Sequence, residues 1–282
     1  MAHAVVHFDI GGPDDRQLAE FYAGLLGWSM RPVQGVDYTL VDTCGGDGIN
    51  GGVVKAADGE PSVAFYVQTD DLQAVLDKVN LLGGKTVTPI TELPGMVTFA
   101  KFEDLDGLII GLVLGPADPG TAAGGTTDGA AQAVPGQLGP GQVGAAQVGA
   151  AQLGSEQSAV PGPSAGTGAP VDWFEVLGSD ADRSQRFYTE IFGWQIKDAG
   201  PGYRMVDTGS AWGIRGGIGG GQEGIWATVY ARVLDVEAAL TTAVELGGAR
   251  EVGPIVVDDH MQTGALRDPA GNVFGVYSHV PH

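Results

Sequence analysis

Two four-residue stretches carry side chains that could do chemistry, and they occupy matching places in the chain. Residues 7–10 read His-Phe-Asp-Ile, and residues 173–176 read Trp-Phe-Glu-Val. Residues two apart on a β-strand project from the same face, so we expect His7 beside Asp9 and Trp173 beside Glu175. A histidine next to a carboxylate can act as a base with an orienting partner. The tryptophan in the second stretch cannot.

Both stretches belong to a longer repeat, which indicates a tandem duplication. Each copy is close to the common size of a domain and can bury its own core. We therefore predict two domains, at residues 1–115 and 171–282, joined by a linker at 116–170. Three pairs of aromatic residues recur 166 positions apart: Phe8 and Phe174, Phe21 and Phe187, and Trp28 and Trp194.

Each copy reads as two modules with the order strand, helix, strand, strand, strand. In the first module Ala4–Ile10 alternates as a strand, with His7 and Asp9 on one face and Val6 and Phe8 on the other. The glycine-rich stretch 216–221 lies between predicted strands and reads as a turn. Apolar residues at helical spacing predict the first helix: Leu18, Phe21, Tyr22 and Leu25.

The composition restricts the function. Three of the 34 acidic residues lie in the linker, so the two copies carry 31 acidic residues against all 14 basic ones. Nucleic-acid binding depends on basic patches, so we expect none, whereas a cationic ligand would be favoured by the long-range field. No apolar run approaches the ~18 residues of a membrane span. We expect no signal peptide, because residues 1–10 lack the basic region and the long apolar core of one. A single cysteine, Cys44, fits a reducing cytoplasm.

The linker consists mainly of Gly, Ala, Gln, Pro, Ser and Thr and contains no aromatic residue. Such a segment buries too little apolar surface to offset its ordering entropy, so we predict that it is disordered. A flexible chain of this length spans roughly 40 Å, so it does not force the copies to pack together. We expect either a monomeric pseudo-dimer or a homodimer.

The repeat resembles the vicinal oxygen chelate superfamily, which includes glyoxalase I, extradiol dioxygenases and bleomycin-resistance proteins. The resemblance rests on Phe-Tyr and Gly-Trp near the end of the first helix of each copy and on Asp-Pro-Ala-Gly-Asn at 268–272. Gly-Ile-Asn-Gly-Gly at 48–52 is similar to actinobacterial glyoxalase-like proteins. The resemblance implies an α+β fold of tandem domains. In each, two βαβββ modules form a cupped mixed sheet with helices outside and a ligand site inside.

Metal-dependent members of the superfamily place His, Gln or Glu on the first and last strands of each module, where they converge on one divalent ion. In the first copy His7 fits this pattern, but Ser62 and Gly111 stand where further ligands are expected. We therefore predict no metal and no other cofactor. In the second copy the corresponding positions hold residues that cannot bind a metal through a side chain: Trp173, Trp226 and Gly275.

Two tryptophans at former ligand positions favour a site that holds a planar or cationic molecule against aromatic faces, although each also fits an ordinary core. Asn50 and Arg215 occupy one slot with different chemistry, which indicates that the two cups differ. His7 and Asp9 are the catalytic candidates. The predicted ligand contacts are His7, Asp9, Tyr38, Asn50, Ser62, Trp173, Glu175, Trp212, Arg215, Trp226, His260 and Tyr277.

Three functions remain open from the sequence. The first is a metal-independent protein that binds an aromatic antibiotic or biosynthetic intermediate, for self-resistance or as an accessory to a tailoring enzyme that would be its partner. The second is a glyoxalase-like lyase, isomerase or hydroxylase-type tailoring enzyme that uses His7. The third is a structural or protein-interaction module.

Overall fold

The computed structural model describes residues 3–94, 96–115, 168–200, 202–220, 224–258 and 261–279. The predicted linker lies almost entirely outside these ranges. The first half contains two helices and eight strands in the predicted order. They are β1 (Val5–Gly12), α1 (Asp15–Leu26), β2 (Ser29–Pro32), β3 (Tyr38–Asp42), β4 (Gly51–Lys55), β5 (Ser62–Thr69), α2 (Leu72–Leu81), β6 (Lys85–Leu93), β7 (Val97–Glu103) and β8 (Ile109–Leu114).

The second half repeats this order. Across the described residues, no helix has both the length and the apolar character to cross a bilayer. The elements are β9 (Val171–Gly178), α3 (Ala181–Phe192), β10 (Gln195–Asp198), β11 (Tyr203–Asp207), β12 (Arg215–Gly220), β13 (Trp226–Arg232), α4 (Val236–Glu245), β14 (Ala249–Asp258), β15 (Met261–Arg267) and β16 (Val273–His279).

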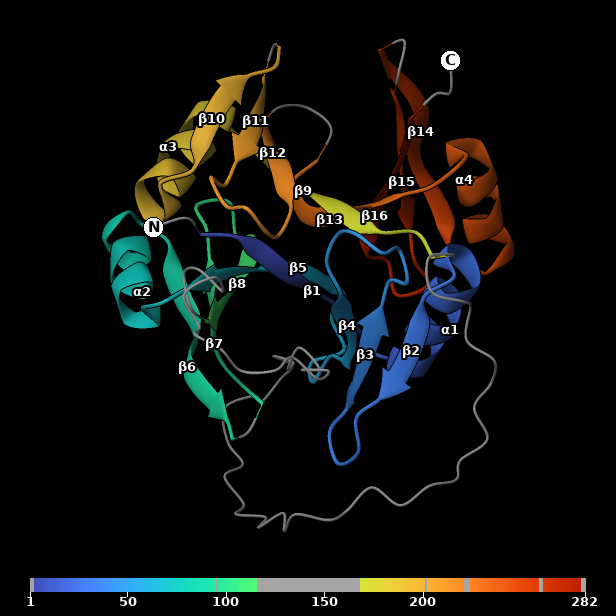
Figure 1. The fold of residues 1–282 in the computed structure, drawn as a ribbon, viewed down its shortest axis with the longest axis horizontal. Helices are drawn as coiled ribbons and strands as arrows, with labels where there is room; N and C mark the ends of the chain where they lie inside the picture. The colour runs from blue at the N-terminus through green and yellow to red at the C-terminus, as the bar shows by residue number, and fades with distance from the viewer. Residues whose placement is uncertain are drawn as a thin grey trace.

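Each half forms one eight-stranded mixed sheet from its own two modules. The strand order is β2-β3-β4-β1-β5-β8-β7-β6 in the first half and β10-β11-β12-β9-β13-β16-β15-β14 in the second. The modules join where β1 pairs antiparallel with β5, and β9 with β13. Each sheet curls, with its helices on the convex side (Figure 1). The predicted α+β fold of paired βαβββ modules is confirmed, and the modules pair within one half.

The helix boundaries follow the expected capping residues. The Asp14 side chain accepts the Gln17 N–H at the start of α1, and Gly27 ends that helix in the left-handed conformation, at φ 69°. Asp180 and Gly193 do the same for α3. These caps fix where the chain turns back from each helix into the sheet, and therefore set the register of the strands that line the site.

Two details of the predicted strands are wrong. A β-bulge between Val5 and His7 shifts the alternation, so Val5 rather than Val6 faces the core with Phe8. The stretch 216–221 is not a turn, because its residues up to Gly220 belong to strand β12. Glycines are needed in that strand because neighbouring rings occupy the space of their missing side chains.

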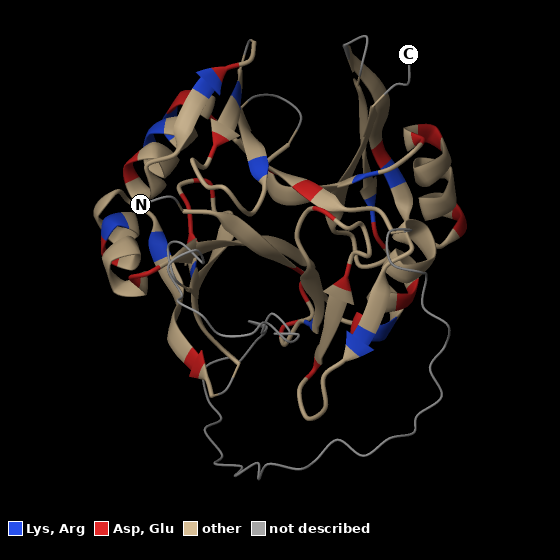
Figure 2. Ribbon diagram, viewed as in Figure 1, with Lys and Arg blue, Asp and Glu red and all other residues tan. Residues whose placement is uncertain are grey.

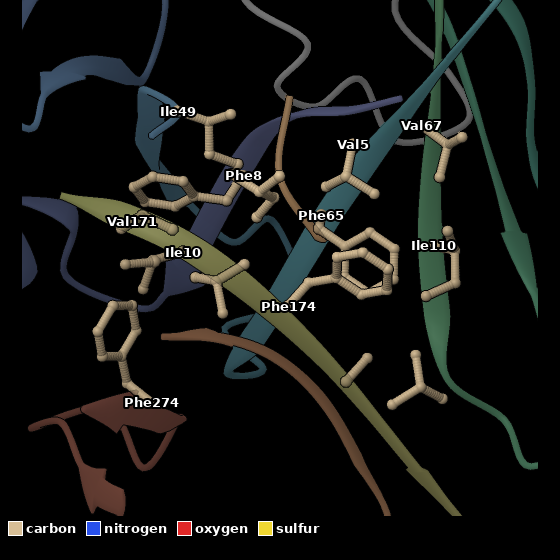
Figure 3. Packing of buried hydrophobic residues seen from close by; sticks show 14 of the residues in the cluster. Val5, Phe8, Ile10, Ile49, Phe65, Val67, Ile110, Val171, Phe174 and Phe274 are labelled. Atoms are coloured by element: carbon tan, nitrogen blue, oxygen red, sulfur yellow. The ribbon is translucent and has the colours of Figure 1, made fainter. Parts of the chain in front are cut away.

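The two sheets pack back to back through their convex faces. Figure 1 shows that α1 lies beside α4 and α2 beside α3, with the two concave faces directed away from each other. Phe65 of the first half lies against Phe174 of the second, with ring centroids 4.8 Å apart (Figure 3). Trp28 and Trp194 each donate an indole N–H to a backbone carbonyl across this contact, at 2.7 and 2.8 Å. The halves therefore share one core.

The repeated sequence motifs meet at this contact between the halves. Tyr22, from the first Phe-Tyr pair, donates to Asp268 Oδ2 at 3.0 Å, and Tyr188, from the second pair, donates to Asp104 Oδ2 at 2.7 Å. Burial raises the pKa of both carboxyl groups, and the tyrosine hydrogen bonds oppose that rise. The two motifs therefore hold the halves together as well as shaping each one.

Replacing Tyr188 with Phe should destabilise the protein more than replacing Tyr22. Asp268 Oδ2 also accepts from Asn272 Nδ2 at 2.8 Å, whereas Tyr188 is the hydrogen-bond donor described for Asp104 Oδ2. We expect Tyr188→Phe to lower the unfolding free energy by about 1.5–3 kcal/mol and Tyr22→Phe by about 0.5–1.5 kcal/mol. Urea denaturation of both variants measures this difference, and equal losses would contradict it.

Candidate functional site

The concave face of the first sheet, here called the first cup, is centred on β1 and β5. His7 lies opposite Tyr66 on these strands. On the flanking strands Gly52 lies beside Asp9 and Gly111 beside Tyr66. The three larger side chains are all buried, with His7 at 5% and Asp9 at 3% exposure. The topology therefore brings a histidine, a carboxylate and a phenol from two modules to one place.

Asp9 is a buried carboxylate held by two phenols. Tyr38 donates to Oδ1 at 2.8 Å and Tyr66 donates to Oδ2 at 2.6 Å. Such hydrogen bonds to an ionised group offset the cost of taking it out of water. Because the one hydroxyl proton of Tyr38 goes to Asp9, the Tyr38 oxygen accepts from His7 Nε2 at 2.9 Å. The four side chains form one hydrogen-bonded chain.

The concave face of the second sheet, the second cup, repeats this cluster around a glutamate. Tyr203 donates to Glu175 Oε1 at 3.0 Å and Tyr230 donates to Oε2 at 2.6 Å. Trp226 Nε1 adds a longer hydrogen bond to Oε2, at 3.4 Å. Burial raises the pKa of Glu175, and the hydrogen bonds from Tyr230, Tyr203 and Trp226 oppose the rise. Both cups therefore rest on a carboxylate clamped by two tyrosines.

Glycines on the neighbouring strands make room for the tyrosine side chains. A Cβ added at Gly52 would overlap the Tyr38 hydroxyl, and one at Gly111 would overlap the Tyr66 ring. A side chain in these positions would push the phenols away from Asp9. The second cup has the same contacts, in the pairs Gly217 with Tyr203 and Gly275 with Tyr230.

The residues of the cups do not fit the metal centre of metal-dependent members. Gly111 and Gly275 stand where the resemblance implies a glutamate ligand, and phenol rings lie over them. Within the described ranges, no group of three or more His, Cys, Asp or Glu side chains is placed to hold an ion. The carboxylate oxygens that remain already accept hydrogen bonds from Tyr38, Tyr66 and their counterparts.

The phenols act as donors and not as sources of protons. Burial raises the pKa of Tyr38, Tyr66 and Tyr230 well above the ordinary tyrosine value, and the charge of the adjacent carboxylate raises it further. A hydroxyl with a raised pKa stays protonated at neutral pH. Each carboxylate–tyrosine cluster thus forms the buried base of its cup, here called the floor. Its polar groups bond to one another, so a ligand would be recognised by the side chains around the floor.

Two of the predicted contacts, Asn50 and Ser62, are exposed at the starts of strands β4 and β5. The Asn50 side-chain oxygen accepts the Thr43 N–H at 3.0 Å. Ser62 lies opposite Gly11, at the far end of the strand from His7. The residue that matches His7 in the second module is Ala64, because both precede their helix caps, Asp14 and Asp71, by the same number of residues.

Two other predicted contacts belong to polar pairs near the junction of the halves. Trp212 donates its indole N–H to Gln68 Oε1 at 3.2 Å, so it lies beside the first sheet although it belongs to the second half. Tyr277 donates to Asp172 Oδ1 at 2.7 Å, and Arg232 lies 3.2 Å from the other oxygen of that carboxylate.

Trp173 and Trp226 remain partly accessible in the second cup, and Arg215 is exposed beside Trp173. Five of the predicted residues thus lie on the concave face of the second sheet: Trp173, Glu175, Arg215, Trp226 and Tyr277. His7, Asp9 and Tyr38 form the first cluster. His260 lies outside the described residues.

Sequence reasoning missed Tyr66, Tyr203 and Tyr230 as members of the clusters. Tyr38 and Tyr203 recur at the start of the same strand in each copy, and this repetition was a usable signal. Tyr66 and Tyr230 recur as well, each beside a glycine of the last strand. The sequence does not show that the four tyrosine hydroxyls converge in pairs on Asp9 and Glu175.

Gly111→Ala should destabilise the first half. The new methyl group would overlap the ring of Tyr66, which is fully buried and cannot move aside. Overpacking of this kind costs about 1–3 kcal/mol. Gly24→Ala is the control, because its Cβ would lie 3.3 Å from the end of the flexible Leu246 side chain and helical alanine is favoured by about 1 kcal/mol. Thermal unfolding distinguishes the two, and an unchanged Gly111→Ala midpoint would refute the expected overlap.

Tyr230→Phe should destabilise the protein more at neutral pH than in acid. The raised pKa of Glu175 means that its ionisation costs stability as pH rises through that value. Removing Tyr230 raises the pKa further, so the loss should be about 1.5–3 kcal/mol when Glu175 is ionised and about 0.5–1.5 kcal/mol when it is protonated. Urea denaturation at both pH values measures the difference. In a Glu175→Gln background the pH dependence of the loss should vanish.

Comparison with known proteins agrees with the fold. The family described as bleomycin resistance protein-like N-terminal matches residues 172–209. The anthracycline biosynthesis protein DnrV of Streptomyces peucetius is 27% identical over 95% of this chain and 90% of its own length. DauV of Streptomyces sp. (strain C5), another anthracycline biosynthesis protein, is 26% identical over the same shares.

Solved structures with low sequence identity show the same architecture. The Mn(II)-bound glyoxalase from Novosphingobium aromaticivorans has a TM-score of 0.61 and 16% identity, covering 99% of this chain and 84% of that one. The 2,3-dioxygenase LapB from Pseudomonas sp. KL28 has a TM-score of 0.59 and 15% identity, covering 100% and 96%. With repeated βαβββ modules and one paired-module sheet in each half, the chain has the tandem fold of the vicinal oxygen chelate superfamily.

Proposed function

We propose that the protein binds a planar aromatic small molecule without a metal, in the biosynthesis of an aromatic antibiotic. The observation that carries this proposal is the pair of carboxylate–tyrosine clusters. In each cup, where the resemblance implies a metal centre, a buried carboxylate already accepts hydrogen bonds through its oxygens. Such a cup would bind a ligand through its shape and its aromatic side chains, and not through a metal ion that acts as a Lewis acid.

The second cup is the better candidate for the binding site. Trp173 and Trp226 come from adjacent strands and are both partly accessible. Met205, on β11 two strands away from Trp173, is 42% exposed. Ligand sites commonly combine such apolar and aromatic walls with a few polar groups, and aromatic stacking adds about 0.5–1.5 kcal/mol to the burial of a flat ring.

The relatives supply the setting of the proposal. Two proteins that match nearly this whole chain are anthracycline biosynthesis proteins, and anthracyclines contain planar fused rings. A protein of this kind would hold an intermediate or product, either to present it to a tailoring enzyme or to sequester it.

A second candidate function, acid–base catalysis, is favoured by one observation in the first cup. His7, Tyr38 and Asp9 form a continuous hydrogen-bonded chain. His7 Nε2 donates to the Tyr38 oxygen, so His7 Nδ1 is the nitrogen that could accept a proton from a substrate. His7→Ala separates the two candidates, because it should abolish turnover of a bound intermediate while leaving binding in the second cup intact.

Trp173→Leu should weaken the binding of anthracyclines by roughly tenfold, since it removes one wall of the second cup. Quenching of tryptophan fluorescence measures the affinity, and the buried Trp28 and Trp194 provide a constant background in every variant. Val256→Ala is a matched apolar control, because Val256 is 66% exposed on another strand. Absence of micromolar binding by the wild type would refute the proposal, as would a stoichiometric metal that is required for binding.

A further inference from the structure

Arg215 lies on the concave face of the second sheet, next to Trp173. The two residues are partners in the parallel ladder between β12 and β9, so their side chains stand side by side on strands about 5 Å apart. Alternate residues share a face, so Arg215 shares the face of Gly217, over which the Tyr203 hydroxyl lies. The arginine is exposed, in contrast to the floor residues Glu175 and Tyr230.

The other charged groups of this face already have partners. Glu175 accepts hydrogen bonds from two tyrosines and Trp226. Asp172 accepts from Tyr277 and pairs with Arg232, which also reaches Asp47 Oδ2 at 2.5 Å. The polar groups around Glu175, and those around Arg232 at the end of β13, therefore already bond to one another.

One more carboxylate, Asp207, ends the adjacent strand β11. Its Oδ1 accepts the Gly209 N–H at 2.9 Å. Over the part of the chain that the structure describes, neither Asp207 nor any other acidic residue forms an ion pair with Arg215. Among the described residues, the Arg215 guanidinium is thus a charged group next to Trp173 without an ion-pair partner.

We propose that Arg215 binds an acidic group, a phenolate or carboxylate, on a planar aromatic ligand that stacks against Trp173. This inference rests on the proposed function and specifies its ligand. The floor cannot supply that recognition, because the hydroxyl protons of Tyr203 and Tyr230 already go to Glu175. A guanidinium offers paired N–H donors that match a carboxylate or an acidic oxygen.

The positive charge of Arg215 favours an acidic ligand, whereas the net charge of the whole chain favours a cationic one. A net charge of −20 favours a cationic ligand at long range, and Figure 2 shows acidic residues spread over both halves. At contact distance a ligand meets specific groups, and salt screens distant charges beyond about 8–10 Å. The first cup lacks this feature because Asn50 stands in the slot of Arg215.

The test compares anthraquinone-2-carboxylate with its neutral isostere, anthraquinone-2-carboxamide, by fluorescence titration of the full chain. We expect the carboxylate to bind roughly tenfold more tightly than the amide. Arg215→Asn, which installs the residue of the first half, should remove this preference and leave the affinity for the amide within about twofold. Arg215→Lys should retain part of it. Arg16→Gln is the control, because it removes the same charge from the exposed outer face of α1.

The outcomes separate this inference from the proposed function. If both probes bind equally, or if the preference survives Arg215→Asn, the assignment of Arg215 is wrong while metal-free aromatic binding stands. If neither these probes nor anthracyclines bind, both proposals fall. An equal effect of Arg16→Gln would show that net charge, and not a contact with Arg215, determines the preference, and would also overturn the assignment.

Discussion

A carboxylate buried at the middle of each sheet is the constraint on which the rest of the site depends. Asp9 and Glu175 lie on the central strand, away from water, where an ionised group without hydrogen-bond donors would be very costly. Tyrosines from β3 and β11, two strands away, and from the other module of each half supply those donors. The hydroxyls of Tyr38 and Tyr203 lie over Gly52 and Gly217, and the rings of Tyr66 and Tyr230 lie over Gly111 and Gly275, so each ring needs a glycine beneath it. The glycines at 52, 111, 217 and 275 therefore make room for the tyrosines that satisfy the buried charge.

The same chemical solution occurs on the other side of each sheet. Between the halves, Tyr22 and Tyr188 satisfy the buried Asp268 and Asp104. Buried tyrosine–carboxylate pairs thus serve in two places, in the cups and at the contact between halves. The contact also explains why the halves pack together although the linker does not require it. Each half leaves a polar group that the other half satisfies, and the aromatic core around Phe65 and Phe174 closes over both.

The sequence predicted most of the fold because periodicity, caps and repetition are local signals. The helices end at Gly27 and Gly193 as expected, and the strands occur in the predicted order. The site was predicted less completely. His7, Asp9 and Glu175 follow from strand alternation, but convergence of Tyr66 on Asp9 depends on the pairing of β1 with β5, which no local pattern specifies. The bulge after Val5 and the strand at 215–220 were missed for a related reason, since both depend on what neighbouring strands place beside them.

Duplication made the differences between the cups interpretable. The arrangement of tyrosines, glycines and central carboxylate is the same in both halves, so the two cups can be compared by the residues that differ around it. In the first cup the central row of the sheet carries His7 and ends at Lys101, whose Nζ lies 5.7 Å from the Tyr66 ring centroid. In the second cup the same row carries Trp173 and begins at Arg215, with Ala265 in the place of the lysine. Each cup thus places one cation beside an aromatic ring, at opposite ends of an otherwise shared row. The two cups therefore differ in where their cation lies, although the tyrosines, glycines and central carboxylate around it are the same.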